Sequence, residues 1–306
     1  KLPEGPVGIA AQYPGDTGIA ADERVIFVED FNEASIDQLF ARWENLKERE
    51  SLSLVADTPS GSADPQSLLV THVGGEGEGG HLYRRLLPGH DRVFLRYYIK
   101  FDPDCAQIHH LGPGIGGYHP ATPWPMGGAG ERPDGAERFT MHLDPFGTSW
   151  TWDFYTYWMG MPVHGDGNYW GAAFMNGGAR PKVERGRWIC IELMLKVNDP
   201  VDAKNGELAC WIDGKLLRHE GQVVSRVGPG FPRGEWSGGW WYPVADSATP
   251  FEGFQWRSDP ALNVNYLWTY VYITKAPRGH VSRIWFDNIV VAQEYIGPMH
   301  PRAGQE

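Results

Sequence analysis

The sequence predicts an all-β protein built as a sandwich of two antiparallel sheets. Its 306 residues include 39 glycines and 24 prolines, which imply many turns and few long helices. Hydrophobic residues make up 42% of the chain, enough to fill a substantial core. About a dozen short segments alternate between apolar and polar residues with turn signals between them, as strands of a sandwich do. Because no repeat or linker divides the chain, we expect one domain over residues 1–306.

Charge and apolar patterning limit the classes of partner. The formal net charge is −11, which argues against nucleic acid as a partner. No stretch approaches the ~20 consecutive apolar residues that a membrane-spanning helix needs, so we expect no membrane partner. We expect a monomeric, secreted or periplasmic protein, trimmed from a precursor.

The three cysteines allow at most one disulfide, and they show no CxxC pattern of a zinc site. Cys190 and Cys210 lie in apolar strands. Buried free thiols and a bridge between strands therefore both remain open.

The first third of the chain alternates between strands and connections. Residues 1–24 are rich in Gly, Pro and Ala, and we expect them to form an arm lying over the domain. In 36–45, Leu39, Phe40 and Trp43 recur at helical spacing, which predicts a short helix with these side chains on one side. The glycine-rich segment 74–80 lacks the Lys and Ser/Thr of a phosphate loop, so it is predicted to be a connection. Strands are predicted over 25–31, 52–56, 67–73 and 92–101.

Two long irregular segments interrupt the strands of the remaining chain. Residues 111–130 (LGPGIGGYHPATPWPMGGAG) are too rich in Gly and Pro for regular structure and long enough to border a binding site. Residues 226–262 are also predicted to be irregular, and the tail 297–306 to be loose. A tight turn at Asp213-Gly214 joins two strands. Strands are predicted over 187–197, 207–212, 215–219, 266–274 and 283–292.

The central stretch GAERFTMHLDPFGTSWTWDFYTYW reads as two strands joined by a turn at Asp144-Pro145-Phe146-Gly147. Successive side chains of a strand point to opposite faces, so Arg138 and His142 share a face of the first strand. Tyr155 and Tyr157 share a face of the second strand. If the strands pair, a guanidinium, an imidazole and two phenols line one wall, which could bind an anionic sugar or act on it.

The order of these motifs resembles polysaccharide lyase family 14 and related lyases with a jelly-roll sandwich of the concanavalin A-like lectin/glucanase type. The resemblance covers about residues 92–218 and rests on four pieces. They are RVFLRYYIKF before HHLGPGIGG, then ERFTMHL, then DFYTYW, and finally RGRWICIELMLKVN with NGELACWIDGKLL. The last piece is common among such sandwiches and implies the fold alone, whereas ERFTMHL and DFYTYW are specific to function.

The resemblance implies β-elimination on a uronate chain, which those lyases perform with an Arg, a Lys and two Tyr. Arg138, Tyr155 and Tyr157 match three of these positions. His110 stands at the position of the Lys, and Ala136 stands where the family has a Ser. A guanidinium is always charged and pairs bidentately with a carboxylate. A phenol near cations could act as base or acid, and His110 could share either role.

Further residues are candidates for binding the substrate. If the sheet order follows that of the family, Arg96, Tyr98 and Lys100 lie on a neighbouring strand of the same concave face. Gln107 is expected at the edge of the cleft. His142 and Trp152 complete the predicted set, whose partner is a polysaccharide or oligosaccharide.

Two other functions remain open on this fold. A retaining glycoside hydrolase needs two carboxylates about 5 Å apart, but the sequence has no Glu-x-Asp-x-Glu triplet. A non-catalytic carbohydrate-binding protein needs only aromatic and hydrogen-bonding side chains. Its candidate platforms are Trp124, Trp150, Trp152, Trp240 and Trp241.

The predicted chemistry requires no cofactor, but a structural Ca²⁺ is a possibility. The first and last strands of such sandwiches often lie together and hold this ion with oxygen ligands. Glu29 and Asp287 are the candidate ligands. The alternative is that both are surface acids near strand ends.

Overall fold

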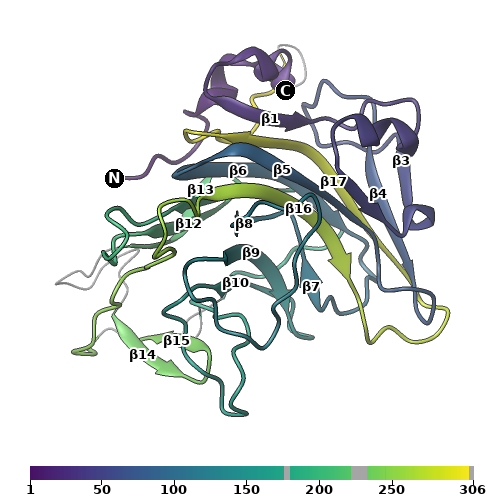
Figure 1. Cartoon of the computed structure of the whole chain (residues 1–306). Helices are drawn as coiled ribbons and strands as arrows, with labels where there is room; N and C mark the ends of the chain where they lie inside the picture. The colour runs from purple at the N-terminus through teal and green to yellow at the C-terminus, as the bar shows by residue number, and fades with distance from the viewer. Residues whose placement is uncertain (176–179, 222–232, 245, 303–306) are drawn as a thin grey trace.

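The computed structural model describes residues 1–175, 180–221, 233–244 and 246–302. Two antiparallel sheets pack face to face, with a small separate hairpin beside them (Figure 1). The chain is therefore the antiparallel β-sandwich that the alternating segments predicted, of the jelly-roll type that the resemblance implied. Among the described residues, no helix is long and apolar enough to cross a membrane.

The first sheet has eight strands and forms one of the two layers of the sandwich. Strand β6 lies at its centre, between β11 and β17, and β1 pairs with β17. The order is β13 (Lys215–Glu220), β12 (Glu207–Ile212), β11 (Ile189–Lys196), β6 (Arg92–Phe101), β17 (Val281–Ala292), β4 (Ser67–Val73) and β3 (Leu52–Val55), with β1 (Val25–Glu29) beside β17.

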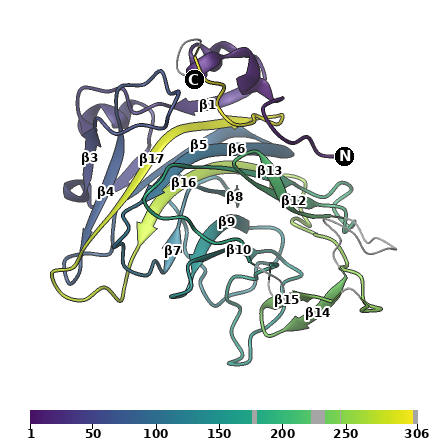
Figure 2. The same cartoon turned by 180° about the vertical axis from the view of Figure 1, so that it is seen from behind.

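The second sheet has seven strands and is curved (Figures 1 and 2). Its order is β10 (Thr151–Tyr157), β9 (Arg138–Phe146), β8 (Gly114–Tyr118), β16 (Val264–Tyr272), β5 (His81–His90) and β2 (Asn45–Lys47), with β7 (His110–Leu111) beside β16. The hairpin of β14 (Gly234–Ser237) and β15 (Trp240–Pro243) falls in a segment predicted to be irregular.

The main hydrophobic core lies between the two sheets. Leu95 and Tyr97 of β6 face Phe139 and Met141 of β9, and all four side chains are buried. Because strand side chains alternate, the intervening residues of β9 and β16 point away from this core. They form the open face of the seven-stranded sheet, where the candidate site lies.

A second core covers the outer face of the eight-stranded sheet. Phe94, Trp211 and Val290 of that sheet pack against Ile9 and Ile296. The N-terminal arm folds there into short 3-10 helices, and the C-terminal end lies beside them (Figures 1 and 2). The helices are η1 (Ile9–Gln12), η2 (Pro14–Asp16) and η3 (Ile19–Ala21).

The predicted loose tail is held in place as far as the structure describes it. The N–H of Met299 donates to the hydroxyl of Tyr98, and the N–H of Gly15 donates to the carbonyl of His300. The tail prediction is therefore wrong for 297–302, while 303–306 lie outside the described residues.

Several other local predictions need correction. The predicted helix is the 3-10 helix η4 (Ile36–Ala41), in which Leu39 is buried but Phe40 is 51% exposed. Another 3-10 helix, η5 (Arg49–Ser51), precedes β3. Strand β9 runs on through the predicted turn to Phe146, so the turn begins at Gly147.

The three cysteines Cys105, Cys190 and Cys210 are all free and buried. Of the two alternatives for Cys190 and Cys210, the structure shows buried thiols rather than a bridge.

Candidate active site

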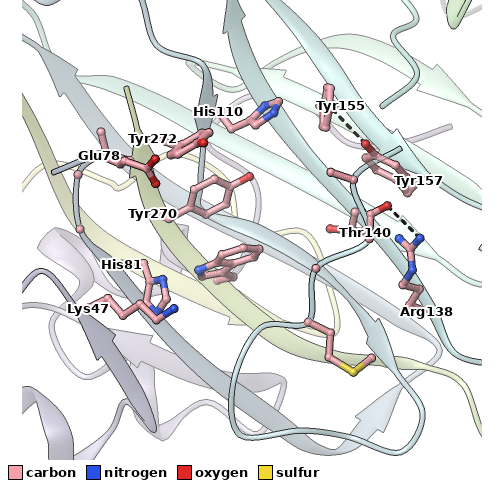
Figure 3. Close-up of a pocket in the computed structure, with 18 of the residues that line it drawn as sticks. Lys47, Glu78, His81, His110, Arg138, Thr140, Tyr155, Tyr157, Tyr270 and Tyr272 are labelled. Atoms are coloured by element: carbon pink, nitrogen blue, oxygen red, sulfur yellow. Dashed lines mark hydrogen bonds between the residues drawn. The ribbon is translucent and has the colours of Figure 1, made fainter. Parts of the chain in front are cut away.

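A groove lies on the open face of the seven-stranded sheet. Its first part is a cavity of about 440 Å³ lined by side chains of β2, β5, β9, β10 and β16 (Figure 3). The second part, of about 670 Å³, shares His110, Ala129, Tyr155 and Tyr272 with the first. The segment from Met126 to Ala129, part of the predicted irregular loop, closes one side of the first cavity.

The pairing of β9 with β10 brings the predicted catalytic side chains together. Tyr155 lies opposite His142, and Tyr157 lies opposite Thr140. Residues opposite each other in an antiparallel pair point to the same face. Arg138, Tyr155 and Tyr157 therefore line the first cavity together, and His110 joins them from β7, as Figure 3 shows. Their roles in catalysis stay predictions.

Hydrogen bonds to the loop that contains Gly128 and Glu131 hold the Arg138 side chain in place. Its Nη2 donates to the carbonyl oxygens of Gly128 at 3.0 Å and Glu131 at 2.8 Å. The guanidinium lies 5.7 Å from the centre of the Tyr157 ring. Gly128 has a φ of +128°, and a Cβ at this position would overlap the guanidinium. A glycine is therefore required where the backbone passes Arg138.

The hydroxyl groups of Tyr155 and Tyr157 form a hydrogen bond of 3.1 Å. Burial, reinforced by the charge and hydrogen bond of Tyr157, raises the pKa of Tyr155 well above its usual value. Burial also raises the pKa of Tyr157, although the hydrogen bond from Tyr155 and the charge of Arg138 act in the opposite direction. Both phenols therefore carry their protons near neutral pH in the protein alone.

His110, His142 and Asp144 form a polar cluster beside the phenols. Oδ2 of Asp144 lies 3.0 Å from Nδ1 of His110 and 3.4 Å from Nε2 of His142. Its Oδ1 accepts the backbone N–H of Leu111 at 2.8 Å. Burial opposes the ionisation of Asp144, but the charges and hydrogen bonds of the two histidines outweigh it and hold the pKa of Asp144 below its usual range.

Sequence reasoning missed Asp144 because it placed this residue in a turn rather than on the cleft face of β9. It also passed over Trp268, Tyr270 and Tyr272, which line the first cavity from β16. Their alternation in YLWTYVYIT was a visible signal, since that segment was predicted to be a strand. Lys47 and His81 gave no such signal, because their strands β2 and β5 were not predicted.

The prediction that Arg96, Tyr98 and Lys100 line the cleft is wrong. Strand β6 belongs to the other sheet, and these three residues point to its outer face. Arg96 is fully buried in an ion pair with Asp16. The hydroxyl of Tyr98 accepts the N–H of Met299 at 2.8 Å, and Lys100 pairs with Asp57.

The other predicted substrate-binding residues lie at three different depths. Gln107 lines the second cavity. His142 is buried beneath the cleft, where its ring nitrogen lies 3.1 Å from the Tyr270 hydroxyl. Trp152 is fully buried in the core, 5.9 Å from the Phe101 ring, so its prediction as a sugar platform is wrong.

Of the other candidate platforms, Trp124 is 56% exposed and Trp240 lines the second cavity. Trp150 and Trp241 are buried.

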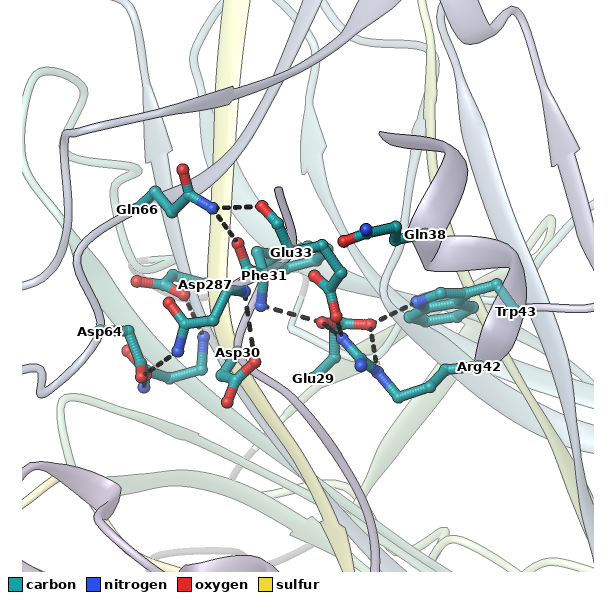
Figure 4. Close-up of polar contacts among 12 residues, drawn as sticks. Glu29, Asp30, Phe31, Glu33, Gln38, Arg42, Trp43, Asp64, Gln66 and Asp287 are labelled. Carbon is teal, nitrogen blue, oxygen red and sulfur yellow. Dashed lines mark hydrogen bonds and ion pairs between the residues drawn. The ribbon is translucent and has the colours of Figure 1, made fainter. Parts of the chain in front are cut away.

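The two candidate calcium ligands are buried rather than at the surface. Figure 4 shows the polar contacts around them. The first and last strands do pair, with Glu29 opposite Ile289. Glu29 accepts hydrogen bonds from the N–H of Phe31 at 2.8 Å and the indole of Trp43 at 2.7 Å, and it forms an ion pair with Arg42 at 2.6 Å. These donors already occupy its carboxylate.

Asp287 fits a cation better than Glu29 does. Its Oδ1 accepts the N–H of Asn288 at 2.8 Å, whereas its buried Oδ2 has no hydrogen-bond partner within the described ranges. Burial, with the nearby charges of Asp64 and Asp30, raises the pKa of Asp287 well above its usual value. A bound cation would relieve this desolvation and repulsion.

Comparisons with known proteins identify the fold of the chain but assign it to no family. No protein-family model and no curated protein matches the sequence. The chain is similar to a solved structure of a mutant of alginate lyase Aly36B in complex with alginate tetrasaccharide, with 13% identity and a TM-score of 0.55, covering 89% of this chain and 98% of that chain. It is similar to alginate lyase vAL-1 from Chlorella virus, also with 13% identity and a TM-score of 0.55, covering 89% of this chain and 100% of that chain. The protein therefore has the jelly-roll sandwich fold that these polysaccharide lyases use.

Proposed function

We propose that the protein is a polysaccharide lyase that cleaves a uronic-acid-containing glycan by β-elimination. The observation that carries the proposal is the meeting of the Arg138 guanidinium with the hydrogen-bonded pair Tyr155 and Tyr157 in one cleft. The similarity to solved alginate lyases supports it through the shared fold.

Arg138 would bind the uronate carboxylate and reduce its charge, which makes the proton on C5 more acidic. Both of its hydrogen bonds to the loop use Nη2. A guanidinium carries three further N–H groups on Nε and Nη1, which suit a carboxylate. His110, at the meeting point of the two cavities, would assist Arg138 from the other side.

Tyr155 and Tyr157 would move the protons. One phenol, as phenolate, takes the C5 proton while the C4–O bond breaks and a C4=C5 double bond forms. The other phenol gives its proton to the leaving oxygen. Tyr157 suits the base, because Arg138 and the hydrogen bond from Tyr155 both favour its charged form. Tyr155 then suits the acid.

The experiment is a substrate panel of alginate, glucuronan, ulvan and neutral glucans. A lyase produces unsaturated ends, whose double bond absorbs in the ultraviolet, from at least one polyuronate. Reducing ends without this absorbance would indicate a hydrolase instead and would overturn the proposal. So would tight binding of a glycan with no cleavage of any kind.

A non-catalytic carbohydrate-binding protein is the second candidate. The raised pKa of both phenols favours it, because neutral phenols bind sugar hydroxyl groups well but are poor bases. In that case the Tyr157→Phe variant would bind glycan more weakly than the parent protein, and neither protein would cleave any glycan.

We also propose a structural Ca²⁺ next to Asp287, on the strength of its unpaired buried oxygen. Thermal unfolding in Ca²⁺ and in a calcium chelator tests it, since a bound ion raises the melting temperature. An equal melting temperature in both solutions would show that no Ca²⁺ ion stabilises the fold. Secretion or periplasmic export and a monomeric state remain proposals, tested by cell fractionation and by size-exclusion chromatography.

A further inference from the structure

The cluster of His110, His142 and Asp144 offers two imidazole nitrogens and one carboxylate oxygen, all within 4.8 Å of one another. The three residues come from β7 and β9, which lie next to each other although 34 residues separate His110 from Asp144. Their meeting point is thus set by paired strands rather than by a loop.

Two of the separations between these atoms match those around a small metal ion. Ligands about 2.0–2.1 Å from a tetrahedral ion lie roughly 3.3 Å apart. The carboxylate oxygen of Asp144 lies 3.0 Å from the His110 nitrogen and 3.4 Å from the His142 nitrogen. An ion could therefore enter the cluster with small movements of the two rings.

The surroundings of the cluster also suit a metal ion. The backbone N–H of Leu111 donates to the second oxygen of Asp144 at 2.8 Å and so turns the first oxygen toward the histidines. Such outer hydrogen bonds orient the ligands of metal sites. Asp144 and His142 are almost completely buried, with side-chain exposures of 3% and 7%.

The open side of the cluster faces the groove. The His110 side chain is 24% exposed, and it lines both cavities. An ion held by these three residues would keep at least one coordination position for water or a ligand in the groove. Sites with three protein ligands and an open position are typical of functional rather than purely structural metals.

We propose that His110, His142 and Asp144 bind a divalent transition-metal ion, with an open coordination position toward the groove. Two imidazoles and one carboxylate favour Zn²⁺, Co²⁺, Mn²⁺ or Fe²⁺ over Ca²⁺, which takes oxygen ligands. The site is separate from the one proposed at Asp287. Metal binding does not depend on the proposed lyase activity, so either proposal can fail alone.

The test is a titration of the full chain, stripped of metals, with Co²⁺ in a buffer that holds excess Ca²⁺ to fill oxygen-only sites. We expect one equivalent to bind and to give the visible absorption of a four- or five-coordinate Co²⁺ with nitrogen ligands. Addition of imidazole should shift the spectrum, because it occupies the open position. Zn²⁺ should displace Co²⁺ and remove the colour.

Two substitutions locate the ion. His110→Ala should weaken Co²⁺ binding at least tenfold, and its partial exposure makes loss of folding a small concern. His109→Ala is the matched control, since the centre of the His109 ring lies 4.4 Å from that of His110 and His109 lines the second cavity but lies outside the cluster.

Absence of a Co²⁺ spectrum in the unaltered protein would overturn the proposal. An unchanged spectrum and affinity in His110→Ala would overturn it as well.

Discussion

The hydroxyl oxygen of Tyr157 lies 3.1 Å from that of Tyr155, inside the cleft that Arg138 lines. The two residues are neighbours on one face of β10, so the strand geometry itself fixes the separation of the phenols. Loss of either hydroxyl leaves the other without its partner.

Tyr157→Phe should lower the rate of unsaturated product formation at least about 100-fold, the usual effect of losing a general acid or base. The change removes one oxygen atom and leaves the ring packing, so the melting temperature should stay close to that of the parent protein. Initial rates and circular dichroism of both proteins provide the measurement. Unchanged turnover would take Tyr157 out of the mechanism.

Gly128→Ala should disturb the position of Arg138 without replacing any residue assigned to chemistry. The new methyl group would overlap the guanidinium and would occupy a backbone with φ of +128°. We expect a raised KM for a polyuronate together with a lowered kcat. Gly127→Ala is the matched control, because a Cβ there meets nothing within 4 Å. Equal kinetics for the two variants would contradict the positioning of Arg138 by this loop.

Arg96 should contribute to the stability of the fold and not to substrate binding. Removing one partner of a buried ion pair typically costs about 3–5 kcal/mol, so Arg96→Leu should unfold at a clearly lower urea concentration. Under conditions where it stays folded, its KM should match that of the parent protein. A raised KM with unchanged stability would restore Arg96 as a substrate-binding residue.

Glu192 should make the stability depend on pH. Burial raises the pKa of its carboxyl to about 7 in the folded protein, although the N–H groups of Ile296 and Gly297 donate to it at 2.8 Å. The unfolded chain has the lower pKa of an ordinary Glu, about 4.3. The stabilising contribution of the proton is therefore complete below pH 4 and is lost as the pH rises to about 7.

The expected loss is roughly 3 kcal/mol, from a difference of between two and three pKa units. Glu192→Gln should abolish this part of the pH dependence, because the amide stays neutral throughout. Urea unfolding of both proteins from pH 4 to pH 8 measures the difference. Parallel pH profiles would show that Glu192 does not titrate in this range.

Local alternation predicted the part of the cleft wall that β9 and β10 form, because the face of a strand residue follows from its position in the chain. Arg138, Tyr155 and Tyr157 could be placed together in this way. Which sheet a strand joins is not local information. The alternation of residues in β6 was clear, but this pattern does not indicate that β6 lies between β11 and β17 in the opposite sheet.

Strand β8 could not be predicted for a different reason. Its sequence GIGGY resembles a flexible loop, yet its glycines serve close packing. A Cβ on Gly114 would approach the His142 Cβ to 2.8 Å, and one on Gly117 would crowd the Phe139 ring. Glycines selected for tight contact between strands look the same in a sequence as glycines selected for turns.

The described residues near both ends of the chain pack over the outer face of the eight-stranded sheet, while the groove opens on the opposite side of the sandwich. A carrier module, affinity tag or surface attachment joined to either terminus would therefore leave the groove unobstructed. The same placement makes the molecule suited to immobilisation through its ends, with the groove turned toward the solution.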